Sequence, residues 1–370
     1  MSFASLVFRN LFRQRMRTTL TIVGISVGIA IVVALGAITG GLRQTAGAMI
    51  GLGGADFMVA REGSGDITFS VLGEDEWGRI AATPGVARAT GVLMHVTQHG
   101  SNPYFPLLGI RPAQLAEAPP ELLSGRLLAP TASDEIVLGA RAAAASGAGS
   151  GSTVVVSDHT FRVVGTYRSG ASFFDAGGYA RLDTVQKLAR KPGSVTIVYV
   201  TAAPGTAPET LAARIDELPT LATVSSVAEY GKVDQGTEIM DALNLAVSTL
   251  AIVLGAIAVM NTMIMAVFER TREFGILRAV GWRGSRIMRL ILVEAVLLCL
   301  VAAFVGVALG VLAAQGVLQL EAVKALLDPR YSPDVFVRAV VIAVGVALAG
   351  ALYPAYRAVR LSPMEALRHE

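Results

Sequence analysis

Residues 260–289 read MNTMIMAVFERTREFGILRAVGWRGSRIMR, and this stretch decides the architecture of the chain. It begins as the end of a long apolar run, changes abruptly at Glu269 into alternating acidic and basic residues, and continues through a basic, glycine-containing segment into a second apolar run. Short arginine-rich connections between two such runs are typical of a cytoplasmic loop between membrane-spanning helices. We therefore expect residues 269–290 to form a cytoplasmic segment between two spans.

The charges of this segment are spaced to pair along one turn of a helix. Glu269 pairs with Arg272, and Arg270 pairs with Glu273, in the i,i+3 arrangement. Apolar side chains follow at once in residues 274–277, so polar and apolar groups share one short helix. A helix that lies on lipid separates them more clearly, whereas apolar anchors with charges at the rim are typical of a surface that docks into another protein. The alternative is a membrane-proximal loop whose arginines only set topology.

The composition requires both a membrane part and a water-exposed part. Of the 370 residues, 53% are hydrophobic and 16% are charged, and the mean hydropathy is +0.58. These values exclude an ordinary soluble enzyme and also a chain that lies wholly in the membrane. The net charge is only +3, and arginines flank apolar runs, so the basic character indicates membrane topology and no nucleic-acid partner. The single cysteine, Cys299, excludes a disulfide within one chain.

Four apolar runs are long enough to cross a bilayer. The first has 25 residues, which at about 1.5 Å per residue reach roughly 37 Å, more than the roughly 30 Å hydrocarbon core. It is also too long for the apolar region of a cleaved signal peptide. The four predicted spans are residues 18–42, 242–268, 291–315 and 335–356.

The placement of arginines orients these spans. They are concentrated in an amphipathic segment at 1–17, in the connection at 269–290 and in the tail at 357–370, whereas the loop at 316–334 carries charges of both signs. The positive-inside rule therefore places both termini in the cytoplasm and residues 43–238 outside the membrane.

Small and polar residues within the spans indicate helix packing. Gly24 and Gly28, and then Gly36 and Gly40, repeat the small-xxx-small spacing that lets membrane helices approach closely, and we predict that they pack a dimer.

Three polar residues, Asn244, Asn261 and Glu294, lie near the ends of apolar runs. For these we favour interfacial or helix-helix hydrogen bonding over a transport site.

The outer segment, residues 43–238, has the pattern of an α+β domain. Short β-branched or alternating runs, such as DEIVLG and SVTIVYVT, are separated by Gly, Pro and Ser. Because a β-rich block near 105–170 interrupts a more mixed pattern, we expect two subdomains. Predicted helices cover 74–82, 184–189 and 208–218, a loop covers 142–152, and a helical stalk covers 225–241.

No catalytic motif is found in the sequence. GxxxxGK[ST] is absent, and the nearest string, residues 147–153, lacks the lysine that would reach phosphates. HExxH and GxSxG are absent too. His95 and His99 share a strand face, but no third ligand lies nearby, so a solvated face is favoured over a metal site. His159 fits a hairpin turn. We expect a non-catalytic chain without a metal or cofactor of its own.

Several strings resemble the MacB/FtsX-type permeases of ABC transporters. They are RTTLTIVGISVGIAIV at 17–32, MNTMIMAVFERTREFGILRAVGWRGSRIMRLILVEA at 260–295 and PAYRAVRLSPMEALRHE at 354–370. In the outer segment SGRLLAP, DEIVLG and FRVVGTY resemble the extracytoplasmic core domain of the same family. The resemblance implies four transmembrane helices with an α+β extracytoplasmic domain between helices 1 and 2, in the bacterial inner membrane.

The same resemblance implies a function and a set of partners. Such permeases dimerise with a second copy or a paralogue, and they work by mechanotransmission with a cytoplasmic ABC ATPase dimer that carries ATP and Mg. MacB itself bears the ATPase ahead of its first span, so we expect a separate ATPase subunit here. A periplasmic adaptor, an outer-membrane channel and membrane lipid complete the expected partners. The segment that contacts the ATPase maps onto Glu269, Arg270, Thr271, Arg272, Glu273, Phe274, Gly275, Leu277, Arg278 and Ala279.

Other functions remain open from the sequence. The substrate of an exporter would be a lipoprotein, a peptide, a lipid or a drug. An FtsX-like regulatory mechanotransmitter would use the same coupling to activate an extracytoplasmic hydrolase without transport. A sensor or resistance module working with a two-component kinase, and a membrane-anchored enzyme, are less favoured, the first on its number of spans and the second for want of catalytic groups.

Overall fold

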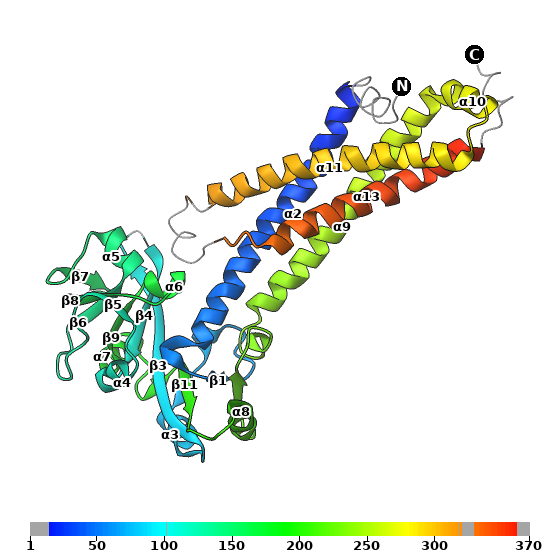
Figure 1. Cartoon of the computed structure of the whole chain (residues 1–370). Coiled ribbons are helices and arrows are strands. Elements are labelled where there is room, and N and C mark those ends of the chain that lie inside the picture. Colours follow the sequence, from blue (N-terminus) through cyan, green and yellow to red (C-terminus); the bar gives the residue numbers. More distant parts are fainter. Residues whose placement is uncertain (1–14, 101, 318, 320–328, 361–370) are drawn as a thin grey trace. The chain divides into compact units, whose positions relative to one another are not determined.

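The computed structural model describes residues 15–100, 102–317, 319 and 329–360 (Figure 1). These residues form two compact units. One is helical and contains residues 15–38, 241–316 and 329–360, and the other contains residues 39–240 and is built on a β-sheet. The predicted amphipathic segment at 1–17, the tail at 357–370 and the loop at 316–334 lie wholly or partly outside the described residues.

Four long helices carry the apolar runs. They are α2 (Arg15–Ile50), α9 (Gly236–Glu269), α11 (Gly284–Val317) and α13 (Pro333–Arg360). A short helix, α10 (Thr271–Ala279), connects α9 to α11. Each long helix has the length and composition of a membrane span, so the predicted class of four apolar helices is confirmed. Each helix extends beyond its apolar run, and polar residues at both ends are part of the helix.

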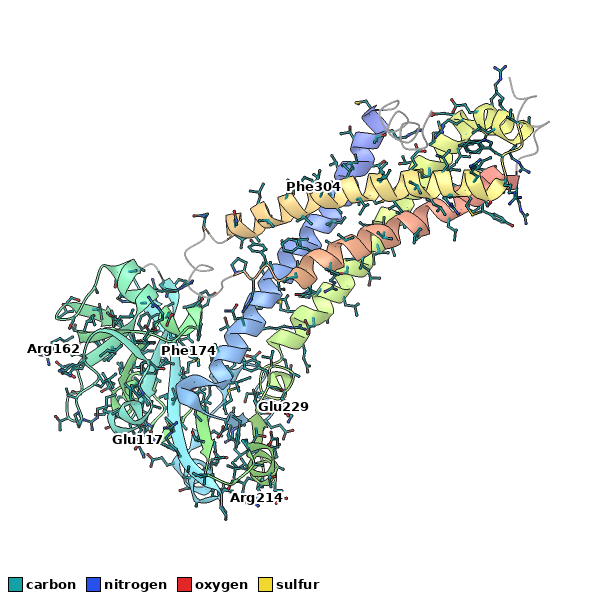
Figure 2. All side chains as sticks on the ribbon, in the orientation of Figure 1. Glu117, Arg162, Phe174, Arg214, Glu229 and Phe304 are labelled. Carbon is teal, nitrogen blue, oxygen red and sulfur yellow. The ribbon has the colours of Figure 1, made fainter. Side chains whose placement is uncertain are left out.

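The surface of the helical unit is apolar, and its interior holds small side chains. Phe304 on α11 points away from the other helices and is 80% exposed (Figure 2). A water-soluble bundle would bury such a ring, so this surface suits lipid. Inside, a Cβ on Gly306 would lie 2.8 Å from the Cβ of Ile29, and one on Gly350 would lie 2.7 Å from the Cβ of Val259. These two glycines therefore allow α11 to approach α2 and α13 to approach α9.

A ten-stranded sheet forms the second unit, and a two-stranded sheet, β2 with β10, lies beside it. The strand order is β12-β1-β11-β3-β4-β9-β6-β8-β5, with β7 paired to β8, and most pairs are antiparallel. The bounds are β1 (Phe57–Arg61), β2 (Leu72–Gly73), β3 (Val86–His99), β4 (Asn102–Ile110), β5 (Glu121–Gly125), β6 (Glu135–Gly139), β7 (Thr153–Val156), β8 (His159–Arg168), β9 (Gly178–Arg181), β10 (Ser194–Val195), β11 (Ile197–Ala202) and β12 (Leu221–Val224).

The predicted α+β class is confirmed, and the β-rich block is one half of a continuous sheet. The parallel pairing of β4 with β9 joins the half made by β12, β1, β11 and β3 to the half made by β6, β8, β7 and β5. Both faces of strands such as β1, β6 and β12 are buried, whereas β5 is exposed. On β1, Phe57 and Val59 contact the apolar cluster under α3, α7 and α8, whereas Met58 and Ala60 contact the cluster that includes the last turns of α2.

Short helices surround the sheet. They are η1 (Leu52–Gly54), η2 (Ile67–Phe69), α3 (Glu74–Ala82), α4 (Pro112–Glu117), α5 (Ala140–Ser146), α6 (Ser172–Asp175), α7 (Leu182–Leu188), α8 (Pro208–Asp216) and η3 (Tyr230–Lys232). The helices predicted at 74–82, 184–189 and 208–218 are confirmed as α3, α7 and α8. The hairpin turn before His159 is also confirmed, because Ser157 and Asp158 have φ of 50° and 60° between β7 and β8.

Two local predictions are wrong. The loop predicted at 142–152 begins instead as helix α5, since its alanines favour a helix that then ends at Gly147, where φ is 64°. The stalk predicted at 225–241 is helical only from Gly236. Before that point the chain makes turns and the short helix η3. Just after η3, the Asp234 carboxylate accepts a hydrogen bond from the N–H of Gly236 at 2.8 Å. That side chain stabilises a turn in place of continuous helix.

Candidate functional site

Helix α10 is a separate element whose end depends on a glycine. The N–H of Gly281 donates to the carbonyl of Arg278 at 3.0 Å, and the N–H of Trp282 donates to the carbonyl of Leu277 at 3.0 Å. This pair of bonds is a Schellman motif, which needs a left-handed residue, and Gly281 has φ of +99°. Leu277 and Trp282 both pack on the apolar core of the helical unit, so the turn that ends α10 is fixed against the bundle.

Arg270 ties the start of α10 to the bundle. Its Nη1 donates to Oε2 of Glu294 on α11 at 3.0 Å, and its Nε donates to Oε2 of Glu273 at 3.1 Å. The guanidinium also lies 5.0 Å from the centre of the Phe274 ring. The predicted pair of Arg270 with Glu273 is therefore confirmed, and so is the hydrogen-bonding interpretation of Glu294. Removing Arg270 would leave the Glu294 carboxylate unpaired in an apolar region, whereas removing Glu294 would leave Arg270 paired with Glu273 alone.

Two further arginines connect this region to the other helices. Arg17 on α2 binds Glu269 through two contacts of 3.3 Å. The spacing of the charges predicts a pair of Glu269 with Arg272, whereas in the structure Glu269 pairs with Arg17. Arg278 donates to the carbonyl of Val359 on α13 at 2.5 Å. The α10 region is therefore bonded to α2, α11 and α13, and a displacement of α10 would act on all three helices.

The side chains of α10 divide into a buried set and an exposed face. Phe274 is 2% exposed, Gly275 is buried and Leu277 is half-buried against the core of the bundle. Thr271 is half-buried and bonds the carbonyls of the α9 end. The exposed face of α10, as we call it below, consists of Arg272, Glu273, Ile276 and Ala279 together with Val280, the residue that directly follows the helix.

This division shows which apolar side chains of α10 are accessible from outside the chain. The ring of Phe274 faces the bundle of its own chain, and Leu277 is largely committed to the same core. Ile276 and Val280, which are 48% and 77% exposed, carry the accessible apolar surface, and neither is among the predicted contact residues. A helical wheel groups them around Ile276, because all five residues of the exposed face fall within about 120° of the helix circumference at 100° per residue.

The four glycines predicted to pack a dimer have different surroundings. A Cβ on Gly28 would lie 3.3 Å from the Cβ of Ala251, and one on Gly36 would lie 3.5 Å from Val335, so both face helices of the same chain. Gly40 is half-buried. For Gly24 the structure places no heavy atom of the described chain within 4 Å of an added Cβ, apart from local backbone. It lies in an exposed apolar stripe on α2 formed by Leu20, Val23, Val27 and Ile31.

Several other polar residues noted in the sequence have structural partners. The Oγ of Ser157 lies 3.3 Å from His95, and the Nδ1 of His99 lies 2.8 Å from the carbonyl of Val155. Within the described residues no cluster of three His, Cys, Asp or Glu side chains is placed to hold a metal. In the helical unit Asn244 is buried beside Ser248, whose Oγ accepts a hydrogen bond from Arg338 at 3.1 Å, whereas Asn261 is exposed.

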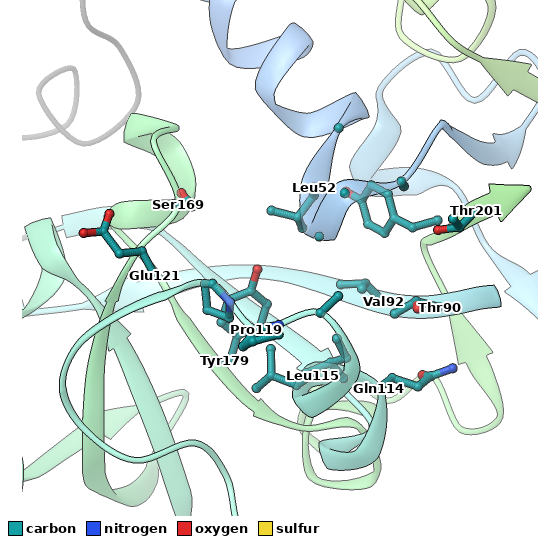
Figure 3. A pocket seen from close by; sticks show the side chains of 18 of the residues that line it. Leu52, Thr90, Val92, Gln114, Leu115, Pro119, Glu121, Ser169, Tyr179 and Thr201 are labelled. Carbon is teal, nitrogen blue, oxygen red and sulfur yellow. The ribbon is translucent and has the colours of Figure 1, made fainter. Parts of the chain in front are cut away.

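The sheet unit contains a pocket of about 580 Å³ (Figure 3). It lies between the last turn of α2 with η1 and the face of strands β3, β9 and β11, and α4 closes one side. Tyr179 and Tyr199 contribute to the wall, and burial raises the pKa of both phenols, so they stay protonated hydrogen-bond donors at neutral pH. Leu52 and Leu115 add apolar surface. Sequence reasoning missed this pocket because its lining comes from segments far apart in the chain.

Two family models match the chain. A MacB-like periplasmic core domain matches residues 18–218, which is more than half of the chain, and an FtsX-like permease C-terminal domain matches residues 245–363. Among curated proteins, the macrolide export ATP-binding/permease protein MacB of Syntrophobacter fumaroxidans is 40% identical over 131 residues, which are 35% of this chain and 18% of that protein. MacB of Bordetella avium is 37% identical over 138 residues, which are 37% of this chain and 21% of that protein.

The matched region is therefore about a fifth of the length of these relatives. Solved structures are more distant. The periplasmic region of MacB from Actinobacillus actinomycetemcomitans is 15% identical with a TM-score of 0.38, covering 50% of this chain and 95% of that one. The extracellular domain of the ABC-type transporter YknZ from Gram-positive bacteria is 11% identical with a TM-score of 0.36, covering 45% of this chain and 98% of that one.

Proposed function

This chain belongs to the MacB/FtsX-type permease family, and on that premise we propose that it is the permease subunit of an ABC transporter that works by mechanotransmission. A cytoplasmic ATPase dimer binds ATP and Mg, changes shape on hydrolysis, and moves α10. The movement passes through the long helices to the extracytoplasmic sheet unit. The chain itself contributes no catalytic group to this cycle.

The observation that carries this proposal is the exposed face of α10. Ile276 and Val280 offer apolar side chains, and Arg272 and Glu273 place charges beside them, which is the composition of a small docking surface. The other side of the same helix is bonded to α2, α11 and α13 through the α10 region. An ATPase whose two states bind this face with different affinity would shift the helices between two arrangements. We assign Phe274 and Leu277 to positioning α10 and not to direct contact.

Dimerisation of the permease follows from the same family, and we place a second copy or a paralogue against the exposed stripe of α2 that contains Gly24. Both termini lie in the cytoplasm of a bacterium, and the sheet unit lies outside the inner membrane. In an organism with two membranes, a periplasmic adaptor and an outer-membrane channel complete the complex of permease and ATPase. The curated relatives are named for macrolide export. The candidate substrates are therefore lipoproteins, peptides, lipids and drugs such as macrolides.

An FtsX-like regulatory role is the second candidate, favoured by the match of residues 245–363 to an FtsX-like permease domain. In that case movement of the sheet unit activates an extracytoplasmic hydrolase, and nothing is exported. The two functions share the contact at α10 and differ in what the sheet unit binds.

The experiment is a mild-detergent pull-down of the tagged chain from its native membranes, with mass spectrometry of the retained proteins. We expect an ABC ATPase to be recovered with the wild-type chain. A variant with Ile276→Asp and Val280→Asp should lose it, because buried carboxylates would face the partner. Val155→Asp is the matched control, since Val155 is 56% exposed on β7, in the sheet unit.

Equal recovery of the ATPase with the wild-type and double-variant chains would contradict docking on this face. The co-purifying extracytoplasmic proteins separate the two functions. An adaptor retained with the ATPase supports export, and a cell-wall hydrolase retained with it supports the regulatory role.

A further inference from the structure

A groove of about 430 Å³ runs along the outside of the helical unit, between α11 and α13. Its wall is apolar except for Ser285 and Arg289, which lie in the first two turns of α11. The two residues are four apart and therefore share one face of that helix, which continues as Leu292 and Val296. The remaining lining residues are Met288, Val293 and Leu297 of α11 and Leu348 of α13.

The length of the groove matches one leaflet of a bilayer. From Arg289 to Leu297 the helix rises about 12 Å, at about 1.5 Å per residue. Half of the roughly 30 Å hydrocarbon core is about 15 Å. A polar end with a positive charge followed by an apolar stripe of this length is the shape of a phospholipid headgroup followed by an acyl chain. The polar end lies on the α10 side of the helical unit, where α11 begins.

The charge of Arg289 also distinguishes a lipid from a second copy of the chain. Arg289 is exposed. In the described part of the helical unit, the acidic residues at this end are Glu269, Glu273 and Glu294, and all three are bound to arginines of their own chain. A second copy could therefore offer Arg289, from these residues, only a carboxylate that is already bound to an arginine of its own chain. A lipid phosphate at this depth has no such intramolecular partner.

We propose that this groove is a binding site for one glycerophospholipid from the leaflet on the α10 side. The phosphate accepts hydrogen bonds from the Arg289 guanidinium and the Ser285 hydroxyl, and an acyl chain lies along Leu292, Val296 and Leu348. The lipid bridges α11 and α13, which also hold α10 through Glu294 and Val359. A bound lipid thus stabilises the pair of helices that position α10.

The test is native mass spectrometry of the purified full chain titrated with phosphatidylglycerol. Arg289→Gln should lower the affinity for the retained lipid about fivefold, the effect of one arginine near a charged lipid surface. Val296→Trp, which fills the groove, should abolish that binding. Arg283→Gln is the matched control, because Arg283 is exposed just ahead of α11 and does not line the groove, and it should bind as the wild type does. Equal binding by Arg289→Gln and the wild type would overturn the proposal, whatever the folding of Val296→Trp.

A second measurement identifies the occupant directly. Phosphatidylglycerol with a photoactivatable group in its acyl chain should label peptides that contain residues 285–297 in native-like vesicles. A chain with Cys299→Ser and Val296→Cys should form little disulfide-linked dimer under mild oxidation. Efficient dimer formation through the introduced cysteine, without lipid labelling, would show that a second copy occupies the groove and would overturn the lipid site.

Discussion

At the scale of single residues, the pair of Arg270 and Glu294 decides where α10 lies. Their side chains are 12% and 10% exposed, so little water reaches the two charges. We predict that Arg270→Met destabilises the folded chain by about 3 kcal/mol, because it leaves Glu294 without its main counter-ion. The double variant with Glu294→Met should recover most of this loss, since an apolar pair removes the unpaired charge.

Titration with a denaturing detergent would measure these stabilities, and Arg272→Met, on the exposed face of α10, is the control for loss of an arginine. The coupling free energy comes from the four-member cycle of wild type, two single variants and double variant. Losses that simply add in the double variant would mean that the two charges do not stabilise each other.

A second residue-scale prediction concerns Glu135 in the sheet unit. Its carboxylate is 2% exposed and accepts hydrogen bonds from Arg126 at 2.5 Å and 2.9 Å, from Arg162 at 3.0 Å and from the N–H of Ala129 at 3.0 Å. The bond from Arg126 is the largest cause that lowers the pKa of Glu135 to about 2. Because the pKa is lower in the folded than in the unfolded chain, the stabilisation is complete above about pH 4.5 and is lost as the pH falls to about 2.

We therefore expect Glu135→Gln to cost about 2 kcal/mol at pH 7 and almost nothing near pH 2. The two arginines are more than half exposed, which keeps the value below that of a fully buried pair. Trp77 and Trp282 are the only tryptophans, so in a Trp282→Phe background the fluorescence of Trp77 reports unfolding of the sheet unit alone. Glu121→Gln is the control, because the Glu121 carboxylate lies 3.8 Å from Arg168 and both side chains are exposed. A cost that does not change with pH would contradict the ion-pair explanation.

At the scale of elements, Gly281 fixes the length and direction of α10. A Cβ at φ of +99° is strained, and Gly281→Ala should cost about 1–2 kcal/mol and loosen the contact of Trp282 with Leu277. Gly345→Ala on α13 is the control, because that glycine is helical and has open space around its Cβ position. Hydrogen exchange of residues 271–282 should rise in Gly281→Ala only. Unchanged exchange there would mean that the turn is held by other contacts.

Sequence reasoning found the elements that depend on local pattern. The apolar runs, the helix α10 between two of them, and helices such as α3 and α8 follow from hydrophobic length and periodicity. It did not find which side of α10 faces the bundle, because the rotation of a short mixed helix is set by Arg270, Glu294 and the Trp282 contact, which are distant in sequence. The prediction of a loop at 142–152 missed α5. The glycines at the end of this segment favour a loop, and the helix-forming alanines at its start were given too little weight.

At the scale of the whole molecule, the strand order of the sheet could not be predicted. The parallel pairs β4 with β9 and β6 with β8 join segments tens of residues apart, and no local pattern fixes such pairing. The pocket depends on that order, since Thr90, Tyr179 and Thr201 meet only after β3, β9 and β11 have been assembled. Helix α10 could be predicted from the sequence, whereas the pocket in the sheet unit could be found only from the fold.

The last prediction separates these two sites in the working protein. If the pocket admits the transported molecule, Ala118→Trp should narrow it and block export, while the ATPase still binds α10. We expect the Ala118→Trp chain to recover the ATPase in pull-downs. The lipids, peptides and lipoproteins of the cell envelope should nevertheless change in the same way as in a cell that lacks this chain. Ala81→Trp, on the exposed side of α3, should match the wild type in both measurements. A wild-type envelope profile with Ala118→Trp would exclude the pocket from the export route, because a bulky indole there would then leave the transported molecule undisturbed.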